Sequence, residues 1–317
     1  MAVSNPFTTV VVGCDDSWQS HAAVEVATLE ASRRHCPLVV LSVARADGLR
    51  GGLAAMRAWE QNAVAAATAT AKGAAERAFA TNSTVPVQIV VASSVDDAQV
   101  SEAARRAELL VVGGYGSRGQ AAFSLGTTSG ELVRRFGTPV LVPRRERATT
   151  PGPWDDRPPE VLVGISPARG ATQPLRAAAR QAELRGWSLG VIHTVPTTHP
   201  GQRLHHEQQA VWDAVRAVPE CASVPCHVEV MQEATVPALI SRCGPRDLLV
   251  VSTRGGGTLA GLIEGSVARG VLDASVCDVM VVPALADSTP GAVADDPAGA
   301  LASATRGVSA TRGVRST

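Results

Sequence analysis

The chain has 317 residues, which suits about two domains of ordinary size. It carries 29 basic and 29 acidic residues, a formal net charge of zero, and only 3% aromatic residues. This balance argues against a protein that binds nucleic acid or an anionic membrane through bulk charge, and against a module that stacks bases on exposed aromatic rings.

The cysteines and the distribution of apolar residues bear on the cellular compartment. The six cysteines are scattered without a C-x-x-C pair, which indicates free, buried thiols in a reducing environment. The sequence shows no leader of basic stretch, apolar run and cleavage site, and no apolar run approaches the roughly 20 residues that span a bilayer. We therefore expect a soluble, cytoplasmic protein that binds neither nucleic acid nor membrane.

In chain order, the first part of the sequence alternates short apolar runs with helical stretches. The runs VVVG, PLVVLSV, VQIVVA, LLVVG and PVLVP predict strands, and the stretches between them predict helices over about 18–34, 52–80, 96–107 and 127–136. Because the runs do not alternate apolar with polar residues, they predict strands that are buried on both faces of a parallel sheet. Asp16 or Ser17 can cap the first helix, and Asp96 the third.

The sequence then repeats itself in the same order. Three of the matches are TVVVGCDDS (9–17) with EVLVGISPA (160–168), ELLVVGGYG (108–116) with DLLVVSTRG (247–255), and GTPVLVPR (137–144) with VCDVMVVPA (276–284). A stretch rich in charge, proline and glycine separates the copies, and the end of the chain lacks apolar periodicity. We expect a first domain over residues 1–145, a linker over 146–158, a second domain over 159–284 and a disordered tail over 285–317.

This alternation predicts an α/β protein with two tandem, doubly wound, parallel five-stranded sheets of the nucleotide-binding type. Ligands of such folds bind at the carboxyl ends of the strands, where the strand order reverses. Gly114, Gly116 and Gly119 fit the dinucleotide fingerprint G-x-G-x-x-G, but that fingerprint belongs to the first strand–helix turn. Here it follows the fourth strand, and the next strand ends without a carboxylate, so both features argue against an NAD site.

A longer pattern is kept in both copies. G-x2-G-x9-G-T runs from Gly113 to Thr127, and S-x2-G-x9-G-S runs from Ser252 to Ser266. Glycines let the backbone approach a ligand closely, and a helix that opens on Gly-Thr or Gly-Ser offers free N–H groups to an anion. The pattern predicts a phosphate cradle without a P-loop lysine, neutralised by N–H groups, a metal ion or Arg118. A turn that only packs strand against helix is the alternative.

VVGCDDS, ELLVVGGYG and the G-x2-G-x9-G-[ST] spacing together resemble the universal stress protein family, specifically its tandem-domain members. The resemblance spans about residues 7–145 and 159–284. It implies that a domain which keeps this pattern binds ATP, and we expect the first domain to bind ATP together with Mg²⁺. It also implies that the last strands, Val140–Pro143 and Val279–Pro283, meet in an intramolecular pseudo-dimer. Further pairing into a homodimer is expected.

The resemblance also implies roles for individual residues of the first copy. Asp15 would hold the adenine or ribose side of the nucleotide, with helix capping as its alternative role. The backbone near Val43 would contact the base. The residues expected to form the turn and to hold the phosphates are Val112, Gly113, Gly116, Gly126, Thr127 and Thr128.

The second copy departs from this pattern at two positions. Ser166 stands where the first copy has Asp15, and Ser252 stands where it has Gly113. Serine carries no charge, and its Cβ restricts the backbone. We therefore expect a weaker second site, built from Gly255, Gly265 and Ser266, or a purely structural domain.

The resemblance therefore implies a regulatory protein that binds an adenine nucleotide, acts in a stress response and has an unknown protein partner. No catalytic residue is expected, because the sequence offers no activated nucleophile with a base, and no metal-ligand spacing is seen. ATP hydrolysis, if present, is expected to be slow. A nucleotide-independent scaffold and a slow ATP hydrolase are the alternatives.

Overall fold

The first repeat of the structure alternates strands and helices as expected. The computed structural model describes residues 8–15, 17–44, 53–114, 127–144, 156–168, 170–195, 202–253 and 266–283. The strands of the first repeat are β1 (Thr9–Gly13), β2 (Leu38–Val43), β3 (Val87–Ala92), β4 (Ala107–Val112) and β5 (Val140–Val142). Its helices are α1 (Trp18–Arg34), α2 (Leu53–Thr81), α3 (Ala98–Arg106) and α4 (Thr127–Arg135).

The second repeat follows the same order of elements. Its strands are β6 (Glu160–Gly164), β7 (Ser188–Thr194), β8 (Cys226–Met231), β9 (Leu248–Ser252) and β10 (Asp278–Val282). Its helices are α5 (Thr172–Arg185), α6 (Gln202–Arg216), α7 (Thr235–Arg242) and α8 (Ser266–Ala274), with a short 3-10 helix, η1 (Pro219–Ser223), before β8. Among the described helices, none combines the length and the apolar character that crossing a bilayer requires. The expected linker, apart from residues 156–158, and the expected tail lie outside the described residues.

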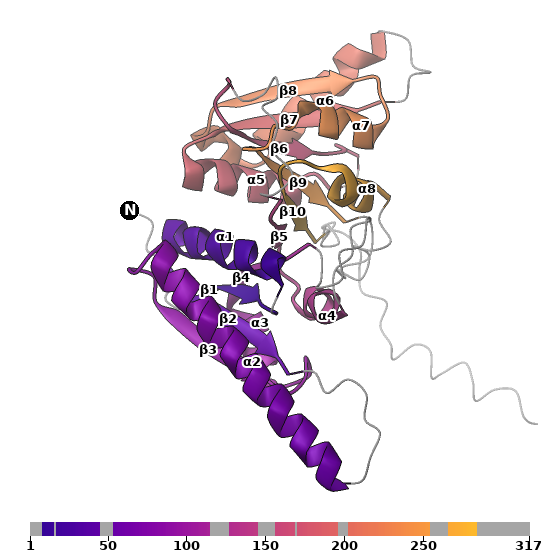
Figure 1. Ribbon diagram of the computed structural model, residues 1–317. Helices are drawn as coiled ribbons and strands as arrows, with labels where there is room; N and C mark the ends of the chain where they lie inside the picture. Colours follow the sequence, from indigo (N-terminus) through magenta and orange to yellow (C-terminus); the bar gives the residue numbers. More distant parts are fainter. Residues whose placement is uncertain are drawn as a thin grey trace, which may run out of the picture. The chain divides into compact units, whose positions relative to one another are not determined.

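Within the described residues, the strands form one ten-stranded sheet with the order β3-β2-β1-β4-β5-β10-β9-β6-β7-β8 (Figure 1). Every neighbouring pair is parallel except β5 with β10, which is antiparallel. Two five-stranded sheets were expected, and the structure joins them because their last strands pair, Leu141 lying opposite Met280. The expected pairing of the last strands is thus confirmed.

Apolar layers cover both faces of the sheet. Val10, Val11 and Val12 are each 0% exposed, although successive side chains of a strand point to opposite faces. Val10 and Val12 belong to a layer with α1, α2, α5 and α6, whereas Val11 belongs to a layer with α3, α4, α7 and α8. Burial on both sides explains why the strands read as continuous apolar runs rather than as alternating ones.

Local capping sets the helix ends. The Ser17 side chain caps α1 by accepting a hydrogen bond from the backbone N–H of Ser20 at 3.2 Å. Helix α3 is capped by Asp97, which accepts from Gln99 N–H at 2.9 Å, so the expected cap at Asp96 was wrong by one residue. A turn closed by the bond from Asp97 N–H to the Ser94 carbonyl, 3.3 Å, delays the start of this helix.

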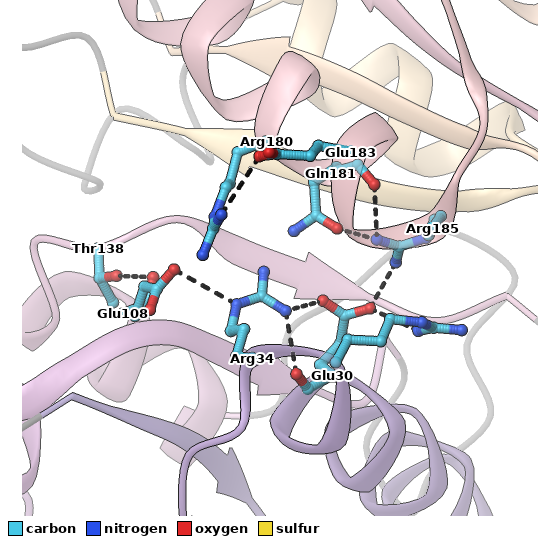
Figure 2. Close-up of polar contacts among 9 residues, drawn as sticks. Glu30, Arg34, Glu108, Thr138, Arg180, Gln181, Glu183 and Arg185 are labelled. Carbon is cyan, nitrogen blue, oxygen red and sulfur yellow. Dashed lines mark hydrogen bonds and ion pairs between the residues drawn. The ribbon is translucent and has the colours of Figure 1, made fainter. Parts of the chain in front are cut away.

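A buried carboxylate links the repeats on one face of the sheet (Figure 2). The side chain of Glu30 on α1 is 0% exposed and accepts hydrogen bonds from Arg34 of its own helix and from Arg185 of α5. Arg33 donates to it as well, at 2.8 Å. Arg34 also lies 3.5 Å from Glu108 at the start of β4, so two carboxylates share the arginines of this cluster.

Candidate functional site

The predicted site residues Asp15 and Gly113 are brought to the same edge of the sheet. Gly13, the last residue of β1, lies opposite Val112, the last residue of β4. Strand β1 pairs with β2 on its other side, so the order of the chain reverses between β1 and β4. Such a switch point is where ligands bind in doubly wound sheets.

The carboxylate of Asp15 is fixed by the turn that leads into α1. Its Oδ1 accepts hydrogen bonds from the N–H of Ser17 at 3.0 Å and from the Ser17 hydroxyl. The N–H of Asp15 in turn donates to the hydroxyl of Ser20 at 3.2 Å. The residue is exposed, and in the described part of the chain its Oδ2 makes no hydrogen bond. The contacts with Ser17 therefore orient the group through one of its two oxygens.

Gly113 allows α1 to approach the end of β4. A Cβ on this glycine would lie 3.0 Å from the carbonyl carbon and from the Cβ of Gln19, in the first turn of α1. Such contacts are tighter than ordinary van der Waals distances, and the backbone of a helix does not give way easily. The absence of a side chain thus positions the helix end that carries the Asp15 turn. The close packing is a reason for glycine here that does not depend on a ligand.

The other predicted residues of this edge lie on neighbouring strands. Val43 ends β2 and is half-buried, and Val112 ends β4 and is buried. At the same edge, burial and, to a smaller extent, the negative charge of Asp15 together raise the pKa of the Cys14 thiol to about 12. A hydrogen bond with the Ser42 side chain acts in the opposite direction. Cys14 is therefore an uncharged packing residue beside the site.

The predicted phosphate loop is described only at its ends. Gly116, Arg118 and Gly126 lie outside the described residues. Thr127 is the first residue of α4 and Thr128 follows it, so both stand at the amino end of a helix, the end that favours anions. The described residues contain no group of three His, Cys, Asp or Glu side chains that could hold a metal ion.

Sequence comparison assigns both repeats to one family. The family model described as the universal stress protein family matches residues 6–144 and 159–283. The chain belongs to the universal stress protein family. Universal stress protein Rv2005c of Mycobacterium tuberculosis is 28% identical over 288 residues, which cover 86% of this chain and 96% of that protein. Universal stress protein Rv2623 of the same organism is 30% identical over 138 residues, 38% of this chain and 46% of that protein.

Solved structures share the fold of this universal stress protein. The crystal structure of a universal stress protein from Archaeoglobus fulgidus aligns with 89% of this chain and 100% of its own, with a TM-score of 0.64 at 15% identity. A structure of a universal stress protein from Pseudomonas aeruginosa aligns with 88% of this chain and 94% of its own, with a TM-score of 0.52 at 18% identity. At these identities the likeness concerns the fold alone.

In the second repeat of this universal stress protein, the equivalent edge is built differently. Ser166 follows β6 and is half-buried, and Ser252 ends β9. Helix α5 begins six residues after Ser166, whereas α1 begins three residues after Asp15. Gly113 of the first repeat has no room for a Cβ because α1 starts close to it. The later start of α5 is compatible with the side chain of Ser252 at the equivalent position. Gly255 and Gly265 lie outside the described residues, and Ser266 is the first residue of α8.

Sequence reasoning missed a histidine that occupies this second edge. Leu41 lies opposite Gly13, and Ile192 lies opposite Gly164, so His193 takes the place of Ser42. The Nδ1 of His193 is 3.0 Å from the Ile165 carbonyl oxygen, and its Nε2 is 3.5 Å from Glu207 on α6. His193 is 8% exposed. The equivalence depends on strand register, and the loose sequence match of this strand gave no reason to single out the histidine.

A second polar contact lies beside this histidine. Thr194, which takes the place of Val43, shares a hydrogen bond with the hydroxyl of Thr235 at 2.8 Å, in the first turn of α7. The end of β7 is thus tied to α6 through His193 and to α7 through Thr194. Among the described residues, the polar side chains at the end of β7 thus contact groups of the second repeat itself.

Proposed function

We propose that the first repeat binds one ATP, accompanied by Mg²⁺, at the edge between β1 and β4, and that the protein is a non-enzymatic nucleotide sensor that acts in a stress response. One observation carries this proposal: Asp15 stands exposed at the strand-order switch point and is oriented through Oδ1, while no described residue forms a hydrogen bond with its Oδ2. A carboxylate held in this way is suited to accept hydrogen bonds from ribose hydroxyls or a base amino group.

The remaining roles follow from where the first-repeat residues stand. The backbone after Val43 would contact the base, and Val112 with Gly113 would form the wall of the turn. The phosphates would lie toward the amino end of α4, near Thr127 and Thr128, with Gly116 and Gly126 of the preceding segment beside them and with Arg118 and Mg²⁺ balancing their charge. ATP would be bound without being hydrolysed, since no reaction step is assigned to these residues.

The second repeat is proposed to bind nucleotide weakly or to be structural. Ser166 cannot supply a negative charge, and the imidazole of His193 stands where the first repeat has a serine hydroxyl. Its contacts to Ile165 and Glu207 would have to be broken before a base could use the same edge. This observation favours a scaffold role for the second repeat, alongside nucleotide binding by the first. Residues of the second-repeat loop, Gly255 and Gly265 with Ser266, would then hold phosphate only weakly.

The remaining parts of the proposal concern activity and compartment. Slow hydrolysis of ATP remains the alternative activity, and a steady release of phosphate by the purified protein, abolished in Asp15→Asn, would favour it.

All six cysteines are free thiols, which fits a reducing cytoplasm. The regulatory partner is proposed to be a protein, because a nucleotide that is bound and not turned over acts by changing what the protein contacts.

The test is a calorimetric titration of ATP with Mg²⁺ into the wild-type chain and three variants. Asp15→Asn keeps an Oδ1 for the Ser17 contacts but loses the charge and one acceptor. Ser17→Ala removes the helix cap and the hydroxyl that donates to Asp15 Oδ1, and keeps the carboxylate. Asp97→Asn is the matched control, because Asp97 makes the same kind of capping turn before α3. AMP and cyclic AMP are titrated as competitors.

The proposal expects Asp15→Asn to weaken ATP binding by about tenfold or more, which corresponds to about 1.4 kcal/mol. Asp97→Asn should bind nearly as the wild type does once it is shown to be folded, and Ser17→Ala, which keeps the carboxylate but loses one of the two donors that orient it, should bind with an affinity between those of the wild type and Asp15→Asn. Equal binding by Asp15→Asn and wild type would remove Asp15 from the site. No heat and no thermal shift with any adenine nucleotide would instead support a nucleotide-independent scaffold.

A further inference from the structure

Strand β3 is one of the two ends of the sheet. It pairs with β2 along Val87–Ala92, and no other described strand lies beside it (Figure 1). The carbonyls of Pro86 and Ala92 accept hydrogen bonds from Leu38 and Ala44, at 2.9 and 2.8 Å, so these two positions face β2. Because backbone groups of a strand alternate in direction, the N–H and C=O groups of Val87, Ile89 and Val91 face away from the sheet.

The two ends of the sheet differ in charge. Residues 78–95, which include β3 and its flanks, contain no charged side chain. Strand β8 at the other end contains Glu229, which pairs with Arg242 at 2.9 Å and lies 3.9 Å from His227. Charged side chains are a usual means of preventing edge strands from pairing with other chains. The end at β8 has this protection, and the end at β3 lacks it.

Exposed apolar side chains collect at the same end. Two of the four large apolar side chains that are exposed among the described residues lie here, Phe79 in the last turn of α2 at 65% and Ile89 on β3 at 45%. Helix α2 packs on β3, and both belong to the apolar layer that contains Val87 and Val91. An open strand edge is thus flanked by apolar surface on the face that α2 covers.

We propose that two copies of this chain pair through β3, antiparallel and centred on Ile89. The outward-facing residues are then self-complementary: Ile89 lies opposite the partner's Ile89, and Val87 lies opposite the partner's Val91. Each of the three pairs exchanges two backbone bonds, about six in total. Ile89, which is 45% exposed, lies on the two-fold axis, so the contact covers this side chain in both copies.

A second copy fits this edge better than another occupant would. An uncharged strand with outward groups at Val87, Ile89 and Val91 matches itself residue by residue, with no like charges opposed. Pairing of β3 with β8 of another copy would continue into a filament, and the charges on β8 oppose it. A two-fold contact between identical edges closes after two copies. This surface is separate from the proposed nucleotide site and does not depend on it.

The first experiment is sedimentation equilibrium of the full chain, without nucleotide, as wild type, Ile89→Lys and Ile89→Pro. The proposal expects a concentration-dependent dimer for the wild type and a dissociation constant raised by about tenfold or more in both variants. Lysine at position 89 would place two positive charges opposite each other on the two-fold axis. Proline at position 89 would remove an outward N–H that pairs only with the partner copy and makes no bond within the sheet. Melting temperatures close to that of the wild type confirm that both variants fold, because Ile89 is exposed.

A cross-linking experiment tests the register independently. Residues opposite each other in a hydrogen-bonded antiparallel pair have Cα atoms about 5.5 Å apart, within the range that a disulfide spans. Ile89→Cys should therefore form a covalent dimer under mild oxidation, whereas Gln88→Cys, also exposed but opposite the partner's Val90, should not. A wild-type monomer at all concentrations, an unchanged dimer in Ile89→Lys, or cross-linking of Gln88→Cys in preference to Ile89→Cys would each overturn the proposal.

Discussion

Glu30 of the first repeat accepts a hydrogen bond at 2.5 Å from Arg185 of the second. Counted back from the left-handed residues that end their helices, His35 and Gly186, Arg34 matches Arg185 and Glu30 matches Gln181. Gln181 accepts a hydrogen bond from Arg185, as Glu30 does from Arg34 (Figure 2). The contact between α1 and α5 thus has an arginine at the matching position of both helices but a carboxylate on α1 only. The buried charge of Glu30 therefore pairs with arginines of both repeats.

Glu30→Gln should destabilise the protein. The substitution keeps the shape but leaves the buried arginines without their central carboxylate. Removing one partner of a buried ion pair typically costs about 3–5 kcal/mol of the free energy of unfolding. Urea unfolding measures the loss. Glu102→Gln is the control, because Glu102 pairs with Arg105 at the surface and such pairs contribute about 0–1 kcal/mol. Equal stability of the two variants would show that the junction does not depend on Glu30.

The contribution of Glu30 should also depend on pH. Burial by itself raises the pKa of Glu30, but the charges of Arg34, Arg185 and Arg33 outweigh it and hold the pKa below its ordinary value of 4.5. Because the folded-state pKa is the lower one, the stabilisation is fully present above pH 4.5 and is lost as the pH falls through the folded-state value. The gap in unfolding free energy between wild type and Glu30→Gln should be constant near neutrality and shrink below pH 4.5. A gap that widens in acid would contradict this sign.

Gly113→Ala should lower the stability of the first repeat. The added Cβ would meet the backbone of Gln19 at 3.0 Å, and overpacking of this kind costs about 1–3 kcal/mol. The displaced end of α1 carries the Asp15 turn, so nucleotide binding should weaken too. Gly73→Ala is the matched control: nothing lies within 4 Å of the new Cβ in the middle of α2. There alanine should stabilise by about 0.5–1 kcal/mol. Thermal unfolding of both variants measures these changes in stability. A Gly113→Ala variant as stable as the wild type would mean that α1 moves away from the added Cβ at no cost.

Cys14 should resist alkylation in the folded protein. With a pKa of about 12, its reactive thiolate is scarce at pH 8, and the residue is only 7% exposed. Cys226 is half-buried and provides the internal comparison. Iodoacetamide labelling followed by peptide mass spectrometry should show Cys14 modified at least about tenfold more slowly than Cys226. In denaturant the two rates should become similar. Rapid native labelling of Cys14 would show that this edge opens.

The order of elements could be predicted because burial on both faces leaves continuous apolar runs in the sequence. The runs around Val10 and Leu110 are examples, and the pairing of the last strands followed from the resemblance to the family. The candidate edge could be predicted from the strand order, since Asp15 and Gly113 follow neighbouring strands. The packing role of Gly113 could not, because it depends on how close α1 lies to β4.

Features that join distant segments had no signal in the sequence. Glu30 and Arg185 each look like an ordinary charged residue near the end of a helix, and they become a buried pair only when the repeats meet. His193 and Glu207 likewise come together through the register of β7 and the placement of α6. Such side chains could be found by aligning the two repeats in space, where Ser42 and His193 coincide and Glu30 matches Gln181.

The most direct measurement is a crystal structure of the full chain grown with ATP and Mg²⁺. The account predicts one nucleotide per chain, with its base or ribose within hydrogen-bond distance of Asp15 Oδ2 and its phosphates toward the amino end of α4. The second repeat should retain the contact between His193 and Glu207. A nucleotide in the second repeat with the first repeat empty, or one bound equally in both, would contradict it.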